Sequence, residues 1–240
     1  MLLTTEQPTR RPTLAVENES TRLWHKKDDR WWIPKASTHF LLKSPLITES
    51  AQANVMARLY VDLVVDSLTE YSYDADLAGL SYDLHAQLGN FVLSVDGYND
   101  KLPVLHKVVL DRLTNLTIDN KRFELIKEQL QRGLENFKLG NPYQHASYHL
   151  SHLTVKDMYT PEEQLAALPN ITAESLRAWV PKVFARSHVE GLVYGNIVKN
   201  DAVKLLKDTE GMLNAKPLTM EERLSARCLV PPTGRHRLFN

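Results

Sequence analysis

The sequence holds a single cysteine, Cys228, among its 240 residues. One cysteine cannot form an internal disulfide, and it leaves any zinc site built from cysteines short of ligands. Cys228 follows an arginine near a proline-rich C-terminus, a context that gives no support to a catalytic thiol. We therefore expect neither a disulfide framework nor cysteine chemistry.

An excess of charge of either sign is also missing. Lys and Arg total 29 and Asp and Glu total 29, so the formal net charge is zero. The basic clusters Lys26-Lys27 and Arg235-His236-Arg237 are too short to form the electrostatic surface that nucleic acid requires. We expect no nucleic-acid partner.

Long apolar runs are absent as well. No segment approaches the roughly 20 apolar residues that a membrane-spanning helix needs. The N-terminus has no basic segment followed by an apolar core, as a secretory signal would. We expect no membrane partner and a cytoplasmic location. The sequence also lacks a G-x-S-x-G elbow and a Walker loop, the marks of two common enzyme classes.

What the sequence does have is a series of short amphipathic segments. Thr38–Leu42 predicts a first strand, and the alternating runs Ser81–Leu88 and Phe91–Gly97 predict a hairpin around Gly89-Asn90, which tolerates positive φ. Val189–Tyr194 predicts a further strand. Apolar periodicity and capping residues predict helices over Ala51–Tyr71, from Pro103, from Asp119, over Tyr143–Leu153, over Pro161–Leu168, from Thr172 towards Arg186 with a kink or interruption at Pro181, and over Lys199–Leu213.

Helices do not separate these strands one by one, which argues against a doubly wound parallel sheet. The order favours an α+β fold, with a mixed or antiparallel sheet and helices packed on one face. The polar residues 1–22 predict an extended lead-in without a packed element. Residues 23–215 form the predicted domain, and 216–240 is interpreted as a linker towards an absent following domain.

Three histidines, His145, His149 and His152, provide the sequence's nearest approach to a metal site. Spacings of four and three place them on one side of a helix, which is compatible with metal binding. However, no general base lies between the first two. We favour a polar helix face with hydrogen-bonded imidazoles, and keep the three residues as metal-ligand candidates.

Several segments together resemble a known family. They are WHKKDDRWWIPKA at Trp24–Ala36, YDADLAGLSYDL and GYNDK within Glu70–Lys101, NPYQH at Asn141–His145, and LVYGNI at Leu192–Ile197. In combination they resemble the middle, third domain of the insulin-degrading enzyme (insulysin) family, the inverzincins of peptidase M16. The resemblance covers about Leu23 to about Leu213. It implies zinc metallopeptidases built from four homologous α/β domains, of which the third carries no zinc.

The family's zinc motif is H-x-x-E-H on a helix, where the histidines bind zinc and the glutamate activates water. None of the nine histidines lies in this pattern, and Ala51–Tyr71, the helix in the corresponding place, contains no histidine. The resemblance therefore implies no catalytic residue and no cofactor bound by this chain. Zinc is expected in an absent catalytic domain.

These observations predict a non-catalytic, substrate-chamber domain of an insulin-degrading-enzyme-like zinc metalloendopeptidase that cleaves peptides. The implied partners are other M16 domains, in the same chain or a separate one, and a peptide substrate. Tyr98 and Asn99, which end a strand-like run, are expected to face the chamber. The alternative is a stand-alone protein-interaction module that kept the fold without activity. The sequence reads as a fragment of a longer protein or as a genuine short product, and we expect it to be inactive alone.

Overall fold

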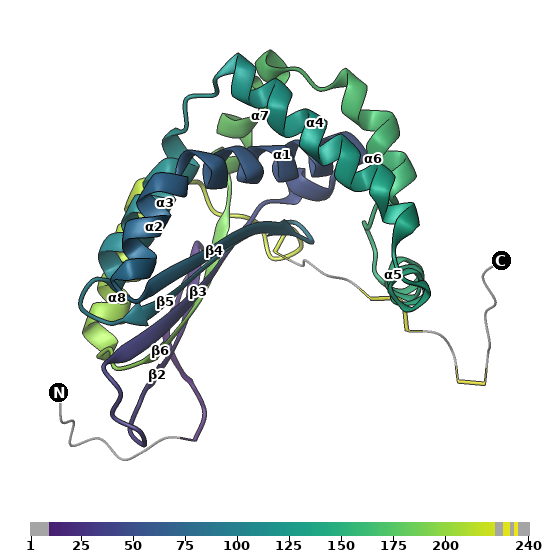
Figure 1. Cartoon of the computed structure of the whole chain (residues 1–240). Coiled ribbons are helices and arrows are strands. Elements are labelled where there is room, and N and C mark those ends of the chain that lie inside the picture. Colours follow the sequence, from purple (N-terminus) through teal and green to yellow (C-terminus); the bar gives the residue numbers. More distant parts are fainter. Residues whose placement is uncertain (1–9, 224–227, 231–232, 235–240) are drawn as a thin grey trace.

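The computed structural model describes residues 10–223, 228–230 and 233–234. Its centre is a six-stranded sheet under a layer of helices (Figure 1). The strands are β1 (Thr13–Glu17), β2 (Thr21–Lys27), β3 (Lys35–Lys43), β4 (Leu80–Gln87), β5 (Asn90–Tyr98) and β6 (His188–Gly195). The helices are α1 (Ala51–Ser67), α2 (Thr69–Leu77), α3 (Leu102–Asn115), α4 (Asn120–Asn136), α5 (Pro142–Thr154), α6 (Pro161–Ala167), α7 (Ala173–Ala185) and α8 (Lys199–Leu213), with 3₁₀ turns η1 (Pro45–Thr48), η2 (Phe137–Leu139) and η3 (Leu168–Asn170).

The strands follow the order β1-β2-β6-β3-β5-β4 across the sheet. β2 and β6 are parallel, and the other neighbouring pairs are antiparallel, so the sheet is mixed. β6, the last of these strands in the sequence, lies between β2 and β3 and joins the C-terminal half of the chain to its beginning. This architecture confirms the predicted α+β class with helices packed on one face.

Alternation along the strands decides which face the helices cover. Phe40 pairs with Leu93, and Leu42 pairs with Phe91, and all four side chains are at most 2% exposed. Truncating a buried aromatic ring to alanine costs about 3–5 kcal/mol, because the site collapses only partly. A slip of one residue would expose this whole layer, so burial fixes the register of β3 against β5.

The predicted helix starts are confirmed at three positions. The side chains of Ser50, Asp119 and Thr172 accept hydrogen bonds from backbone N–H groups three residues later, at 3.1, 3.0 and 3.1 Å. α7 continues through Pro181 without interruption, because buried residues on both sides of the proline hold its turns against the core. Among the described residues, no helix is long and apolar enough to cross a membrane.

The structure divides one of the predicted helices into two. The expected helix Ala51–Tyr71 ends at Ser67, and α2 begins at Thr69. Between them Leu68 leaves helical geometry, with φ −101° and ψ 0°, and its side chain is 1% exposed. The Thr69 hydroxyl also donates to the carbonyl of Asp66 at 2.9 Å. The buried Leu68 thus marks the point where the chain leaves α1 and enters α2, which leads to β4.

The expectation of a lead-in without packed structure was wrong for the described part of residues 1–22. β1 forms there and pairs with β2. Neither strand was predicted from the sequence. The Asn18 side chain accepts hydrogen bonds from the N–H groups of Ser20 and Thr21, both at 2.8 Å, and closes the turn between the strands. The predicted boundary at residue 23 therefore falls inside β2.

The chain is still packed where a linker was expected to begin. The carbonyl of Lys216 accepts a hydrogen bond from the N–H of Ser187 at 3.1 Å, and Leu218 is 2% exposed. Glu222 forms an ion pair with Arg186 at 2.6 Å. These contacts extend the packed domain to Arg223. Most of the residues after Arg223 lie outside the described part of the chain.

Candidate functional site on the open face of the sheet

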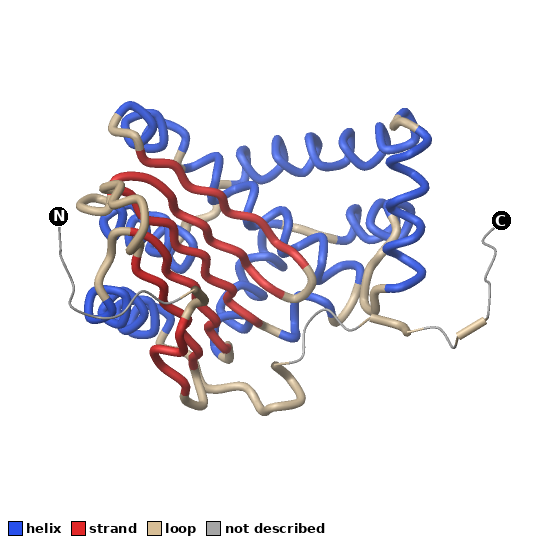
Figure 2. Tube along the Cα trace, turned by 90° about the horizontal axis from the view of Figure 1, so that it is seen from below, coloured by secondary structure: helices blue, strands red, loops and turns tan. Residues whose placement is uncertain are grey.

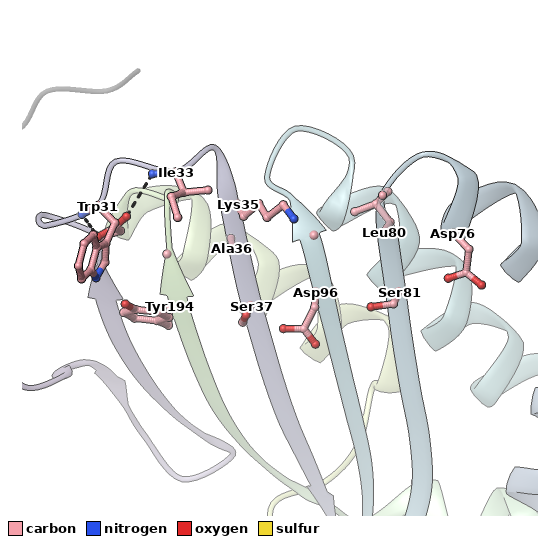
Figure 3. Close-up of a pocket in the computed structure, with 14 residues that line it drawn as sticks. Trp31, Ile33, Lys35, Ala36, Ser37, Asp76, Leu80, Ser81, Asp96 and Tyr194 are labelled. Atoms are coloured by element: carbon pink, nitrogen blue, oxygen red, sulfur yellow. Dashed lines mark hydrogen bonds between the residues drawn. The ribbon is translucent and has the colours of Figure 1, made fainter.

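The face of the sheet opposite the helical layer is not covered by helices in the described part of the chain (Figure 2). Register places five polar side chains from five strands in one row across it, in the order Lys26, Tyr194, Ser37, Asp96 and Ser81. In Figure 3 the last four project to the same side. This row is polar and joins strands far apart in the sequence, whereas the pair Trp24 and Leu192 adds apolar side chains to the same face.

A pocket of about 500 Å³ lies at one end of the open face. Its wall on one side is the β2–β3 connection with Trp31 and Ile33, and on the other side the end of α2 with Asp76 (Figure 3). Four residues of the row, Tyr194, Ser37, Asp96 and Ser81, also line the pocket. The pocket therefore forms where two connections rise above the ends of the central strands.

Asp28 organises the β2–β3 connection. Its carboxylate accepts hydrogen bonds from the N–H groups of Arg30 and Trp31 at 3.0 Å and of Ile33 at 3.3 Å. Burial by itself raises the pKa of this carboxyl, but these backbone hydrogen bonds outweigh burial and hold the pKa below its usual value. The ionised Asp28 thus holds Trp31 and Ile33 at the pocket wall.

Two glycines allow neighbouring backbone segments to approach each other closely beneath the pocket: Gly97 beside Gly79 and Leu80, and Gly195 beside Lys35 and Ala36. Gly97 has φ +132° and Gly195 has φ +115°, a region that L side chains rarely adopt. A Cβ atom at Gly195 would stand 2.6 Å from the Lys35 carbonyl oxygen. At Gly97 it would collide with the backbone of Gly79 and Leu80. The pocket floor depends on the absence of these side chains.

The pocket carries unneutralised negative charge. Asp76 and Asp96 line it with Ser81 between them (Figure 3), and no described residue forms an ion pair with either carboxylate. The amine of Lys35 lies over the Tyr98 ring, 5.4 Å from its centroid. Trp31 is 66% exposed and offers an indole face. The pocket thus presents two carboxylates, an exposed indole and hydroxyl groups to solvent.

The two predicted chamber residues lie beside this pocket but do not line it. The Tyr98 ring packs over Gly79, and the residue is 47% exposed. The N–H of Asn99 donates to the Pro34 carbonyl at 3.2 Å. Asn99 thus joins the end of β5 to the β2–β3 connection, whereas Tyr98 packs against the turn between α2 and β4. Their contact with a chamber remains a prediction.

The three candidate histidines lie on α5 and contact aromatic rings. His145 meets Phe137 edge-on, with ring centroids 4.8 Å apart, and His152 stacks on Tyr148 at 6.4 Å. His149 also packs edge-on against Tyr148, at 5.6 Å. No group of three or more His, Cys, Asp or Glu among the described residues is placed to hold a metal ion.

Sequence reasoning missed most of the pocket. Alternation in β3 and β5 already marks Ser37 and Asp96 as facing away from Phe40 and Val95, and this signal identifies the open face. The contribution of Tyr194 depends on β6 inserting beside β3, a pairing that no local pattern reveals.

A mixed sheet under helices, with one open face and a pocket at its end, defines an α+β domain. A family model described as the middle or third domain of peptidase M16 matches residues 2–167. Because this match spans more than half of the chain, the protein belongs to the peptidase M16 family through this domain.

The relatives are much longer than this chain. It is 41% identical over 211 residues to insulin-degrading enzyme of Bos taurus and of Homo sapiens, which covers 86% of this chain and 21% of each relative. Nardilysin of Homo sapiens is 32% identical over 225 residues, or 94% of this chain and 20% of nardilysin. The chain thus spans about a fifth of the length of the curated relatives it matches.

Solved structures share the fold. A crystal structure of pitrilysin superposes with a TM-score of 0.83 at 23% identity, covering 90% of this chain and 23% of pitrilysin. The peptidase M16 inactive domain from Pseudomonas fluorescens gives a TM-score of 0.64 at 16% identity, covering 87% of this chain and 52% of that one. At these identities the likeness concerns the fold alone.

The zinc ion that the family implies does not fit the residues that α1 offers. This helix contains no histidine, and it presents Asn54, Arg58 and Asp62 to a groove beside β4. Zinc in proteins is bound by imidazole, thiolate and carboxylate groups, whereas a guanidinium repels a cation. We therefore derive no catalytic step through a metal in these residues.

Proposed function

We propose that this chain is a non-catalytic domain that lines the substrate chamber of an insulin-degrading-enzyme-like zinc metalloendopeptidase, which cleaves peptides. The observation that carries the proposal is the open sheet face with its pocket, in a domain of the M16 family. A mostly antiparallel sheet commonly leaves one face to solvent, and the side chains that this face contributes to the pocket are largely polar, as expected for a surface that meets water and peptide.

In this proposal the chain positions substrate and another domain cleaves it. The carboxylates of Asp76 and Asp96 attract basic side chains of the peptide, and the hydroxyls of Ser37, Ser81 and Tyr194 bond to its backbone. Zinc and its H-x-x-E-H motif belong to a separate M16 domain, in the same chain or another one. Alone, this chain is expected to cleave no peptide.

The test is complementation. Human insulin-degrading enzyme from which the matching fifth of the chain has been removed is expressed with and without this domain, and cleavage of a fluorogenic peptide is measured. The proposal expects zinc-dependent cleavage only when both pieces are present. A version of the large piece with Gln in place of the motif glutamate must stay inactive. If the pieces associate without cleavage, or do not associate, the chamber role is wrong.

Exposed apolar side chains of η2 and α5 favour the second candidate, a stand-alone protein-interaction module. Leu139 of η2 is 83% exposed, Tyr143 and Leu150 of α5 are 68% and 64% exposed, and α5 has no buried residue. As a module the chain would bind a protein partner through these side chains and gain no activity in the complementation assay. The cytoplasmic location also stays a prediction, since one relative from Arabidopsis thaliana is described as peroxisomal.

A further inference from the structure

The two edges of the sheet are protected differently. β1 is five residues long, and its pairing with β2 is interrupted by a register shift between Leu14 and Val16. β4 is eight residues long and pairs with β5 in unbroken register, without proline or bulge. Short length and bulges protect an edge strand from accepting a further strand, whereas a long regular edge invites one.

The free backbone groups of β4 follow from its hairpin. Leu88 and Gly89 form a two-residue turn with φ values of 45° and 81°, so Gln87 and Asn90 form a hydrogen-bonded pair. By alternation, residues 81, 83, 85 and 87 bond to β5. The N–H and C=O groups of residues 82, 84 and 86 point to the outer edge, and no described residue hydrogen-bonds to them.

A groove of about 290 Å³ lies along this edge, between α1, β4 and α6. The N–H of Ser44, which precedes η1 and then α1, donates to the carbonyl of Gly89 at 3.0 Å, and α2 leads from the other end of α1 into β4. α1 therefore runs antiparallel to β4 (Figure 1). Asn54, Arg58 and Asp62 follow one another along the groove, at the opposite end of β4 from the open-face pocket.

Two opposite charges face this groove without an ion pair among the described residues. They are Arg58, which is exposed, and Asp62, whose pKa is raised by burial and lowered less by the charge of Arg58. Four helical residues span about 6 Å. Alternate side chains of a strand are about 6.7 Å apart. Two side chains on one face of an added strand can thus meet both charges.

We propose that the free edge of β4 binds an extended peptide segment as an additional strand, with an acidic and a basic side chain two residues apart facing Arg58 and Asp62. Backbone hydrogen bonds to residues 82, 84 and 86 supply affinity, and the charge pair supplies selectivity. This site does not depend on the chamber role, because it needs neither zinc nor another domain.

The test uses the whole chain and two labelled seven-residue peptides of threonine and valine. One has Glu at its third and Lys at its fifth position, and the other has these two exchanged, so that both strand directions are covered. Fluorescence anisotropy is expected to show binding of one peptide in preference to the other. Amide hydrogen exchange at Tyr82, Leu84 and Ala86 is expected to slow about tenfold or more on binding.

Ala86→Pro removes an N–H that points away from β5, so it blocks the edge without breaking the hairpin. It is expected to weaken binding about tenfold or more. Ala15→Pro, at the bulge of β1, is the matched control and should bind as the wild type does. Because A86P alone leaves the charges unexamined, a second variant exchanges Arg58 and Asp62 (R58D with D62R) and should exchange the peptide preference.

The proposal is overturned if neither peptide binds at about 1 mM, or if the charge exchange leaves the preference unchanged. It is also overturned if sedimentation shows that a second copy of the chain pairs along β4 instead. If A86P fails to fold, the charge-exchanged variant and the exchange rates decide. Failure here leaves the complementation assay unaffected, since that assay reads cleavage.

Discussion

The Nε2 atom of His106 on α3 lies 3.1 Å from the hydroxyl oxygen of Thr209 on α8. That hydroxyl donates its own proton to the Leu205 carbonyl at 2.9 Å, so the imidazole must be the donor and carry its proton on Nε2. The ring is 1% exposed and packs against Phe40, with centroids 4.7 Å apart. No described residue accepts a second proton from Nδ1. The fold therefore holds a neutral histidine between two helices and the sheet.

We expect this histidine to make stability pH-dependent. Burial lowers the pKa of His106 to about 4, whereas in the unfolded chain it is 6.5. Between these values the unfolded state binds more protons, so the free energy of unfolding falls as the pH drops from about 6.5 to about 4, by at most roughly 3 kcal/mol. Urea unfolding at several pH values measures this slope. His106→Gln should reduce this slope without abolishing it, because burial also lowers the pKa of His188.

Gly97 and Gly133 form a matched pair. Gly97→Ala should destabilise the domain by about 2 kcal/mol or more, because it adds a side chain at φ +132° against the backbone of Gly79 and Leu80. Gly133 lies inside α4 with open space around it, so Gly133→Ala should stabilise by about 0.5–1 kcal/mol. Thermal unfolding measures both. Equal effects of the two changes would contradict the role given to Gly97.

The elements that the sequence predicted well are those whose determinants are local. The β4–β5 hairpin has its turn glycine and alternation within 20 residues, and α4 has its cap at Asp119. β2 was missed because His25 and Thr21, two of its buried positions, are polar and look like surface residues. His25 Nε2 instead hydrogen-bonds to the Ile197 carbonyl at 2.9 Å, a partner 172 residues away.

The candidate site was harder to predict for the same reason. Tyr98 and Asn99 were chosen because they end a strand-like run, and the structure places both beside the pocket. The lining itself joins Trp31, Asp96 and Tyr194, which come together only through the β2-β6-β3-β5 order. Similarity to a family identifies the type of domain, but the order of the strands in the sheet determines which side chains lie on one surface.

Zinc is expected to leave the isolated chain unchanged. His145 contacts the ring of Phe137 in η2, and His149 and His152 contact the ring of Tyr148 in α5. Among the described residues these histidines belong to no group placed to hold a metal ion, so we expect no stabilisation by zinc. Melting curves with zinc and with zinc plus a chelator should coincide. A rise in melting temperature that the chelator reverses, and that His149→Ala abolishes, would show that the three histidines do bind metal.

Neutralising the pocket should change substrate preference in the complemented peptidase. Asp76→Asn together with Asp96→Asn removes two lining carboxylates that no described residue pairs, so KM for peptides with basic residues should rise about three- to tenfold with kcat unchanged. KM for neutral peptides should not move, and the difference should shrink at high salt because exposed charges are screened. Asp83→Asn, on the same face but outside the pocket lining, is the control. An equal rise in KM for basic and neutral peptides would mean that the pocket acts through its shape rather than its charge.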